Sequence, residues 1–575
     1  MLNNVDRRLI PSRAYPDSAS HQVFRIREWF GLVFDADLRS LAAFRIAMAV
    51  IVLIDLTGKV PNLTAFFTDE GLLPRRALLA ELRPWSISLN LMSGTFVVQS
   101  FLFGVAFLAA LAMLVGYRTR PATIVVWIMV LSIQWRNPFL LHAADELLRV
   151  VLFWSMFLPL GARWSVDRWK HPTAMRISNR FVSAGVAGLF LQIAFVYWFA
   201  VILKSGREWR IDGTALYYAL SSDELISPTG TYLLHFPGLL KVLTYATLAV
   251  EVIAPILLFS IFYKGPLRTA GVALIMSLHF GILVTMNIGY FPLLSAFCMV
   301  CYLPAWFWDV LVPRIRSTVS ISSRLRHLAD QAASIPVRVY HSPLWNRLVT
   351  MKEAGLRFVS VGAGGATGLI DNPPSSMQAH GQHLTYANDG ESSISLRSSA
   401  GSNLIAAFFL IYVFVMNITT VTDYTMPLAE ASLPMAVALG LDQRWAMYSP
   451  TPAQFTYWLS VPGVLNDGRK VELLQAVTHQ EPDRIDEVSL DKPGNVNETF
   501  RDIYWLRYLT TLSMPVAQER LLNFGGYICR SWNAWYPEGP MQLQTFDIVY
   551  ITQPTLPDGK RGDIQYQVIW QHRCR

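Results

Sequence analysis

Three side chains that can take up and release a proton lie beside or inside long apolar runs of this chain. Lys204 directly follows the run FVYWFAVIL, His279 lies in the middle of a second run, and His142 lies in a short loop between two others. Desolvation at the end of an apolar helix favours the neutral form of an amine, and only the neutral amine is a base. The position of Lys204 therefore predicts that its amine abstracts a proton in an apolar pocket.

Each of these residues also has a purely structural interpretation. A lysine at the end of a membrane helix commonly extends its amine toward water, a histidine inside a helix commonly bonds to a carbonyl group, and a histidine in a loop commonly lies at the surface. Glu251 lies in another apolar run, and its simplest expected partner is Arg45 or Arg149. No spacing of His and Cys in the sequence is typical of a zinc site, so the sequence predicts no metal.

The composition of the 575-residue chain is that of a membrane protein. Hydrophobic residues make up 53 % and charged residues 15 %, whereas soluble domains carry about 25 % charged residues. The mean hydropathy is +0.34, and the apolar residues gather in runs too long for ordinary core helices. The net charge of +8 comes largely from arginines beside these runs. No segment combines a dense basic face with exposed aromatic residues, which argues against nucleic-acid binding.

Runs of about 20 apolar residues predict membrane crossings. We expect an all-α bundle of eight or nine spans, with the bounds 40–57, 96–117, 121–137, 145–162, 183–203, 241–263, 268–287, 290–312 and 403–418. The third and fourth runs are interrupted or polar at their ends, and the ninth is short.

Basic residues in the short loops predict the orientation of this bundle. With the amino terminus in the cytoplasm, the inner segments hold fifteen lysines and arginines and the outer segments nine. Residues 1–40 carry six arginines and no short apolar core, so we expect the first run to be an uncleaved anchor. The same orientation places His142 and Lys204 on the outer side, toward which the run that contains His279 leads.

This orientation divides the chain into five predicted parts. They are a cytoplasmic segment (1–40), a transmembrane domain (41–312), a cytoplasmic linker (313–402), a final transmembrane helix (403–418) and an external β-rich domain (419–575). The second part of the linker is rich in Gly, Ser and Asn, and it holds too few apolar residues to order itself. We therefore expect part of the linker to be disordered.

Alternating apolar and polar residues predict the strands of the external domain. Such stretches lie at 455–461, 547–553 and 566–570, and Asp467-Gly468 between two runs signals a hairpin turn. A β-rich domain outside the membrane follows from this pattern.

The four cysteines fit the same topology. Cys298 and Cys301 lie inside a predicted span and are expected to be packing residues. Cys529 and Cys574 lie in the external domain, where an oxidising environment would join them in a disulfide. Two free, buried thiols are the structural alternative for this second pair.

The first apolar run and the loop that follows it carry a specific pattern. Asp55 lies ten residues after Arg45, which stands in the sequence FRI, and TDEGLLPR follows at 68–75. This pattern resembles the opening of the horizontally transferred transmembrane (HTTM) domain family, to which the vitamin K-dependent gamma-carboxylases belong. WSVD at 164–167 supports the same resemblance.

Two further stretches extend the likeness. LKSGREW, with Lys204, Glu208 and Trp209, is similar to the stretch around the active-site lysine of the carboxylases. His279, nine residues before Ile288-Gly289, resembles a second family histidine. The likeness covers roughly residues 35–312 and, more weakly, the external domain.

The resemblance implies a chemistry for this chain. The carboxylases oxidise a reduced vitamin K-type naphthoquinone with O2, and the strong base that forms removes a γ-proton from a glutamyl side chain, which then captures CO2. The implied partners are membrane lipid, the quinol and a protein or peptide substrate held by the external domain, with no metal and no nucleic acid. The implied catalytic residues are Lys204, His279 and His142, and the implied substrate-binding residues are Asn137, Trp209 and Glu208.

The chain departs from the animal carboxylases in two respects. A single lysine stands where they have two in a row, and four residues separate Asn137 from His142 where they have an adjacent Asn-His pair. Arg136-Asn137-Pro138 and WAMYSPTP at 445–452 instead resemble the bacterial branch of the family, which predicts a bacterial inner membrane. Two other functions remain open, a non-enzymatic membrane scaffold or lipid- or quinone-binding protein, and a quinol epoxidase that does not carboxylate.

The predicted orientation can be tested with reporter fusions at residues 20, 350 and 575. We expect the first two reporters to be cytoplasmic and the third to be external, because the inner loops carry fifteen of the counted basic residues and the outer loops nine. Alkaline phosphatase and a cytoplasmic fluorescent protein supply opposite readouts at each site. An external reporter at residue 350 would contradict this topology.

Overall fold

The computed structural model describes residues 28–171, 177–318, 395–422, 427–514, 517–557 and 559–574. Most of the segments predicted at 1–40 and 313–402 therefore lies outside the described residues. The described residues up to Asp309 and the described residues from 395 onward form one compact unit.

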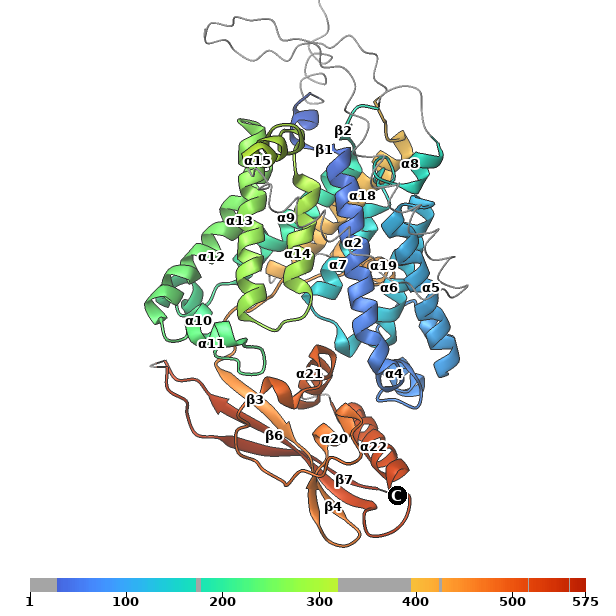
Figure 1. Ribbon diagram of the computed structural model, residues 1–575, viewed down its shortest axis with the longest axis vertical. Coiled ribbons are helices and arrows are strands. Elements are labelled where there is room, and N and C mark those ends of the chain that lie inside the picture. Colours follow the sequence, from blue (N-terminus) through green and yellow to red (C-terminus); the bar gives the residue numbers. More distant parts are fainter. Residues whose placement is uncertain are drawn as a thin grey trace, which may run out of the picture. The chain divides into compact units, whose positions relative to one another are not determined.

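Six helices in the described part of the chain are long and apolar enough to cross a membrane. They are Leu38–Phe67, which comprises α2 (Leu38–Lys59), η1 (Val60–Asn62) and α3 (Leu63–Phe67), then α5 (Phe96–Val115), α9 (Ala184–Leu203), α12 (Pro237–Leu258), α13 (Lys264–Thr285) and α18 (Ala400–Val421). Each overlaps a span predicted from the sequence, and Figure 1 shows them side by side. The chain is thus a multi-pass membrane protein of mostly helical structure.

Helix α9 lies at the centre of this bundle. Its most apolar stretch is 78 % buried, against 22 % for the corresponding stretch of α18, and it contacts α7 (Ala143–Ser155), α12 and α18. A helix that is apolar on all sides is expected in such a position, because every face meets either another helix or lipid.

The predicted count of eight or nine spans is not confirmed. Helix α7 has 13 residues, and about 20 are needed to cross the apolar core of a bilayer. Helix α6 (Thr119–Arg136) has 18 residues and ends in an arginine. The span predicted at 290–312 is bent: α14 (Phe291–Cys298) and η5 (Met299–Tyr302) end before Pro304, a second helix begins at Phe307 at an angle of 91°, and the two together form either a seventh, broken span or a re-entrant loop. Proline lacks the N–H that would continue the helix.

The chain that follows α18 returns to the helical bundle before it enters the C-terminal sheet. Helix α19 (Pro427–Leu439) ends at Gly440, whose carbonyl oxygen accepts a hydrogen bond of 3.0 Å from Arg149 Nε. Gln192 Nε2 of α9 donates a hydrogen bond of 2.6 Å to Gln443 Oε1, and Trp445 is fully buried. This segment is therefore part of the core that surrounds α9.

The C-terminal part contains one antiparallel sheet of five strands. Four strands follow the order β3-β6-β4-β5, and β7 pairs with β6; their bounds are β3 (Phe455–Ser460), β4 (Pro462–Leu465), β5 (Lys470–Glu472), β6 (Leu543–Pro554) and β7 (Gln565–Arg573). Three of these strands coincide with the alternating stretches predicted from the sequence. The predicted hairpin turn joins β4 to β5, and Gly468 adopts a φ of 84°, a conformation that glycine allows without steric cost.

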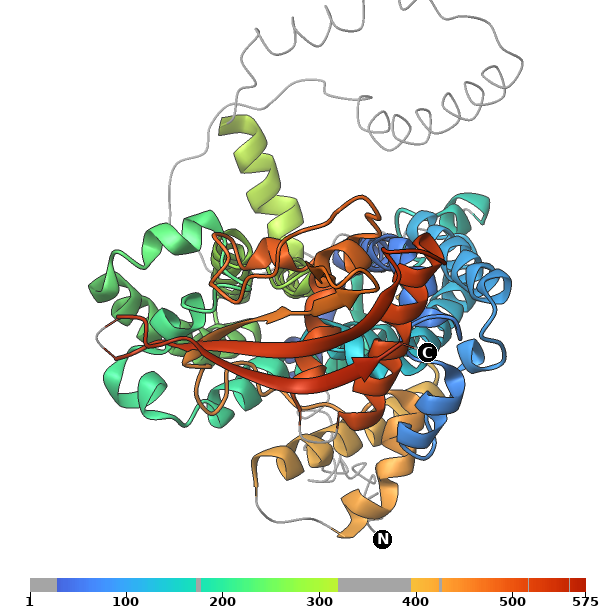
Figure 2. The ribbon, with the colours of Figure 1, turned by 90° about the horizontal axis from the view of Figure 1, so that it is seen from below.

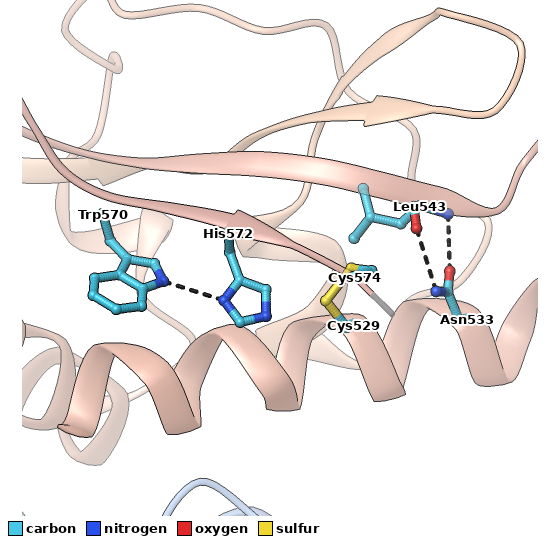
Figure 3. Close-up of a disulfide and its surroundings, with 6 residues drawn as sticks. All are labelled: Cys529, Asn533, Leu543, Trp570, His572 and Cys574. Atoms are coloured by element: carbon cyan, nitrogen blue, oxygen red, sulfur yellow. Dashed lines mark hydrogen bonds between the residues drawn. A yellow bond between two sulfur atoms is a disulfide. The ribbon is translucent and has the colours of Figure 1, made fainter. Parts of the chain in front are cut away.

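Helices complete this part of the chain, so it is a mixed α and β structure with a sheet. The helices are α20 (Leu474–His479), α21 (Ile503–Thr510) and α22 (Gln518–Trp535). Figure 2 shows the strands from below as a broad curved layer. A disulfide between Cys529 of α22 and Cys574 after β7 confirms the predicted pair, with 5.6 Å between the two Cα atoms (Figure 3). This bond links the helix to an edge strand of the sheet, while Cys298 and Cys301 are buried free thiols.

Helix α21 joins the C-terminal part to the membrane helices. Asp502 caps α21 by accepting hydrogen bonds from the backbone N–H groups of Tyr504 and Trp505. The same carboxylate accepts a hydrogen bond of 2.6 Å from Asn62 Nδ2, and Trp505 Nε1 donates one of 3.0 Å to Asn62 Oδ1. A second contact comes from α22, where Arg530 donates to the carbonyl oxygens of Glu70 and Gly71.

A buried carboxyl group lies at another point of this junction. Glu224, in the loop after α10 (Ala215–Leu220), is only 4 % exposed and accepts a hydrogen bond of 2.8 Å from Thr456 Oγ1 of β3. Burial raises the pKa of Glu224 to about 7, because the ionised form loses its hydration. The stabilising contribution of the protonated carboxyl is complete below the unfolded pKa of about 4.5 and is lost as the pH rises through 7.

The melting temperature of the detergent-solubilised protein should therefore fall between pH 5 and pH 8, and Glu224→Gln should reduce this fall. A pKa difference of this size corresponds to about 3 kcal/mol at most, because each pKa unit is worth about 1.4 kcal/mol. Thermal unfolding at both pH values, with the exposed Glu498→Gln as the matched control, provides the measurement. An equal fall in wild type and Glu224→Gln would contradict this role of Glu224.

Candidate functional site

Lys204 forms a buried ion pair with Glu251. The lysine caps the carboxyl end of α9, and its Nζ lies 2.6 Å and 2.7 Å from the two carboxylate oxygens of Glu251 on α12. The lysine is 4 % exposed, and its amine lies 5.1 Å from the centre of the Trp209 ring. Apolar residues fill α9 up to this point, so the amine reaches its partner in surroundings of low polarity.

The expected pairing of Glu251 with Arg45 or Arg149 is wrong. Arg45 donates instead to backbone carbonyl oxygens, among them that of Trp164 at 2.6 Å, and Arg149 donates to Gly440 and pairs with Asp442. The partner of Glu251 is therefore Lys204, and the Lys204 amine lies next to a carboxylate.

His279 lies close to the Lys204 pair. Its Nε2 is 2.9 Å from the hydroxyl oxygen of Tyr197, which lies seven residues before Lys204 and hence on the same face of α9. Phe291 contacts the imidazole with 5.7 Å between ring centres. The other ring nitrogen, Nδ1, is buried and has no hydrogen-bond partner in the part of the chain that the structure describes. The hydrogen bond between Tyr197 and His279 thus joins α9, which ends at Lys204, to α13, which carries His279.

His142 belongs to a second cluster of buried polar groups. Its Nδ1 is hydrogen-bonded to the carboxylate of Asp145, and the hydroxyl of Tyr290 donates to the same carboxylate at 3.1 Å. Lys59 lies 3.5 Å from Asp145 and 2.6 Å from Asp55, one helical turn earlier on α2. We call Asp55, Lys59, His142, Asp145, Tyr290, Tyr504 and Arg507 the outer network, because it lies at the end of the helical bundle that contacts the C-terminal part.

Consecutive aromatic residues at the start of α14 connect the two clusters. The ring of Tyr290 lies 5.6 Å from that of His142, and the ring of Phe291 lies 5.7 Å from that of His279. Both histidines therefore lie next to the beginning of one helix.

The remaining predicted site residues divide between the site and its surroundings. Trp209 contacts Lys204, and its Nε1 donates to the Tyr448 carbonyl oxygen at 2.9 Å. Asn137 is buried and donates to the Phe66 carbonyl oxygen at 3.0 Å, so the backbone holds its amide. Glu208 accepts a hydrogen bond of 2.8 Å from Gln454 Nε2.

Sequence reasoning missed four members of the outer network. Lys59 follows Asp55 by four residues, a spacing that favours ion pairing on one helix and that could have been noticed. Tyr290 and Arg507 had no comparable signal. Tyr504 lies between two cations, with Lys59 at 5.8 Å and Arg507 at 5.9 Å from its ring centre.

A pocket of about 340 Å³ lies beside the outer network. The loop between α13 and α14 forms one wall, and the start of α21 forms the other; its lining includes Met286, Asn287, Gly289, Asn497, Arg501 and Ile503. Within the described residues, no group of three or more His, Cys, Asp or Glu side chains is arranged to hold a metal ion.

The comparisons with known proteins agree with the membrane location of this site. Residues 34–306 match the family model of the HTTM domain, and this range contains Lys204, Glu251, His279 and His142. Among curated proteins and among solved structures, no match to the chain was found. Residues 34–306 of this chain are therefore an HTTM domain, and the apolar helix α18 lies outside it.

Proposed function

We propose that this protein is a membrane enzyme of the vitamin K-dependent carboxylase type, in which Lys204 is the base that deprotonates a reduced naphthoquinone. HTTM domains are found in membrane proteins of this type. The observation that carries the proposal furthest is the Lys204–Glu251 pair, which lies buried beside Trp209 and on the same helix face as the partner of His279.

The ion pair supplies a way to make Lys204 a base. An ammonium group and a carboxylate 2.6 Å apart share a hydrogen bond, and moving its proton to Glu251 leaves a neutral amine and a neutral acid. In surroundings of low polarity this transfer removes two buried charges together, so it requires less free energy than it would in water. The neutral amine can then accept a proton from an acidic hydroxyl group.

Two imidazoles could form hydrogen bonds with the oxygen atoms of a hydroquinone. His279 Nδ1 and His142 Nε2 are both buried without a hydrogen-bond partner among the described residues, and a buried polar atom in this state favours a ligand that bonds to it. The aromatic rings of Tyr290 and Phe291 lie beside the two histidines and that of Trp209 lies beside Lys204, and each could pack against a flat ring.

When bound, a reduced naphthoquinone would supply, through its oxidation by O2, the strong base that removes a γ-proton from a glutamyl side chain, which then takes up CO2. The role of this chain is to bind the ring, to accept the first proton at Lys204 Nζ and to keep water away. An apolar cavity around Lys204 is part of this proposal, as is an external C-terminal part that holds a protein or peptide substrate. The proposed location is a bacterial inner membrane with the amino terminus in the cytoplasm.

The base assignment predicts the effects of changes at Lys204. Lys204→Ala should lower hydroquinone oxidation by about 10²–10⁴-fold, the usual effect of removing a general base. Lys204→Arg should not restore activity, because a guanidinium group stays charged. Epoxide formation by purified protein with reduced naphthoquinone and O2 provides the measurement. Lys241→Ala, an exposed lysine on α12, is the matched control and should leave the rate unchanged.

A lone Glu251 carboxylate could destabilise the Lys204→Ala protein, so the pair is also replaced as a unit. Lys204→Met with Glu251→Gln removes both charges and should fold and insert while remaining inactive. Equal epoxide formation by wild type and this double variant would end the base assignment. No epoxide from wild type with any quinol would favour the scaffold or binding protein, and epoxide without carboxylation would favour the quinol epoxidase.

A further inference from the structure

Helix α21 of the C-terminal part places two side chains in the outer network of the membrane part. Arg507 Nη1 lies 3.7 Å from Asp145 Oδ2, and the Tyr504 hydroxyl lies 3.3 Å from Asp55 Oδ1. Arg507 also approaches the carbonyl oxygens of Leu140 at 3.4 Å and Ile288 at 3.5 Å, which flank His142 and Tyr290 in the sequence. A residue more than 350 positions away in the chain thus reaches the surroundings of His142.

The charges of the outer network balance only when α21 is counted. Asp55 and Asp145 are two carboxylates, and Lys59 is one cation bonded to both. Arg507 is the second cation, and its partner Asp145 is 1 % exposed. Uncompensated charge is costly to bury, so this network favours two cations for its two carboxylates.

This balance decides the state of His142. An ionised carboxylate only accepts hydrogen bonds, so the Asp145 carboxylate requires the proton of a neutral His142 ring to be on Nδ1. Nε2 then carries a lone pair, and this atom is buried with no partner in the described residues. Without Arg507 the network would hold one excess negative charge, which a proton on His142 would neutralise, and the lone pair would be lost.

We propose that Arg507 is a positioning residue of the membrane site: by balancing the buried charge of Asp145, it keeps His142 neutral with a free lone pair on Nε2. The C-terminal part then completes the site in addition to any contact it makes with a substrate. The effect on turnover rests on the proposed function, whereas the effect on the His142 ring does not.

The alternative is that Arg507 only helps to dock α21. Other contacts also hold α21 against the membrane helices, however, including the hydrogen bonds of Asn62 with Asp502 and Trp505. Arg530 is the matched residue, because it also extends from the C-terminal part to the membrane part, where it bonds to the backbone carbonyl oxygens of Glu70 and Gly71 and, among the described residues, to no carboxylate there. Docking alone predicts similar effects of the two arginines, whereas charge balance predicts an effect of Arg507 only.

The experiment is ¹⁵N NMR of the full chain in nanodiscs with labelled histidine, with the His142 signals assigned from their loss in His142→Gln. Wild type should show one protonated and one bare nitrogen for this ring near neutral pH. Arg507→Gln should show both nitrogens protonated, and Arg507→Lys, which keeps the charge, should resemble wild type. Arg530→Gln should also resemble wild type. In epoxide assays Arg507→Gln should lower kcat by about 10–100-fold with a smaller change in KM, an effect of the size seen when the hydrogen-bond partner of a metal-bound histidine is lost.

A charge-balanced double variant keeps the test decisive if Arg507→Gln fails to fold. Arg507→Gln with Asp55→Asn removes one positive and one negative charge, so His142 should keep its bare nitrogen in a folded protein. A doubly protonated His142 ring in this variant would overturn the proposal, as would an unchanged ring in folded Arg507→Gln or a changed one in Arg530→Gln. If neither wild type nor any variant forms epoxide but the protonation of the His142 ring changes as described, the proposed function fails and the charge-balance inference stands.

Discussion

The neutralisation of buried charge is the constraint on which the rest of this structure depends. A bilayer and a helix core offer no water to solvate an ion, so each buried ionisable group needs a partner within a few ångströms. Arg45 meets this requirement with backbone carbonyl oxygens, Lys204 with Glu251, and Asp145 with two cations. Each solution joins elements that are distant in the sequence, so the ion pairs also determine which helices lie side by side.

The same constraint explains why the C-terminal part is not a separate module. Its helix α21 carries Arg507 into the outer network, and its strand β3 carries Thr456 to the buried carboxyl of Glu224. One hydrophobic core continues from the membrane helices into α21 and α22. A mutation in the C-terminal part can therefore change the membrane site through charge as well as through substrate contact.

Most of the fold could be predicted because its signals are local. An apolar run of about 20 residues is sufficient to predict a spanning helix, and alternation with period two predicts a strand, as in β3, β6 and β7. The predicted bounds were less accurate where a helix end depends on a single residue. Helix α7 has only 13 residues and begins after its N-cap His142, and the span expected at 290–312 is bent between Tyr302 and Phe307. Helices α21 and α22 were not predicted, since the strand pattern dominated that part of the sequence.

The candidate site could be predicted only in part, and the limit is physical. The sequence by itself determined that ionisable groups such as Lys204, His279 and Glu251 lie in or directly beside long apolar runs, because hydropathy is a property of consecutive residues. Only the tertiary structure decided their partners: Glu251 with Lys204, Tyr197 with His279, and Arg507 with Asp145. An ion pair depends on the distance between two side chains, and that distance is decided by how helices pack, which involves residues far apart in the chain.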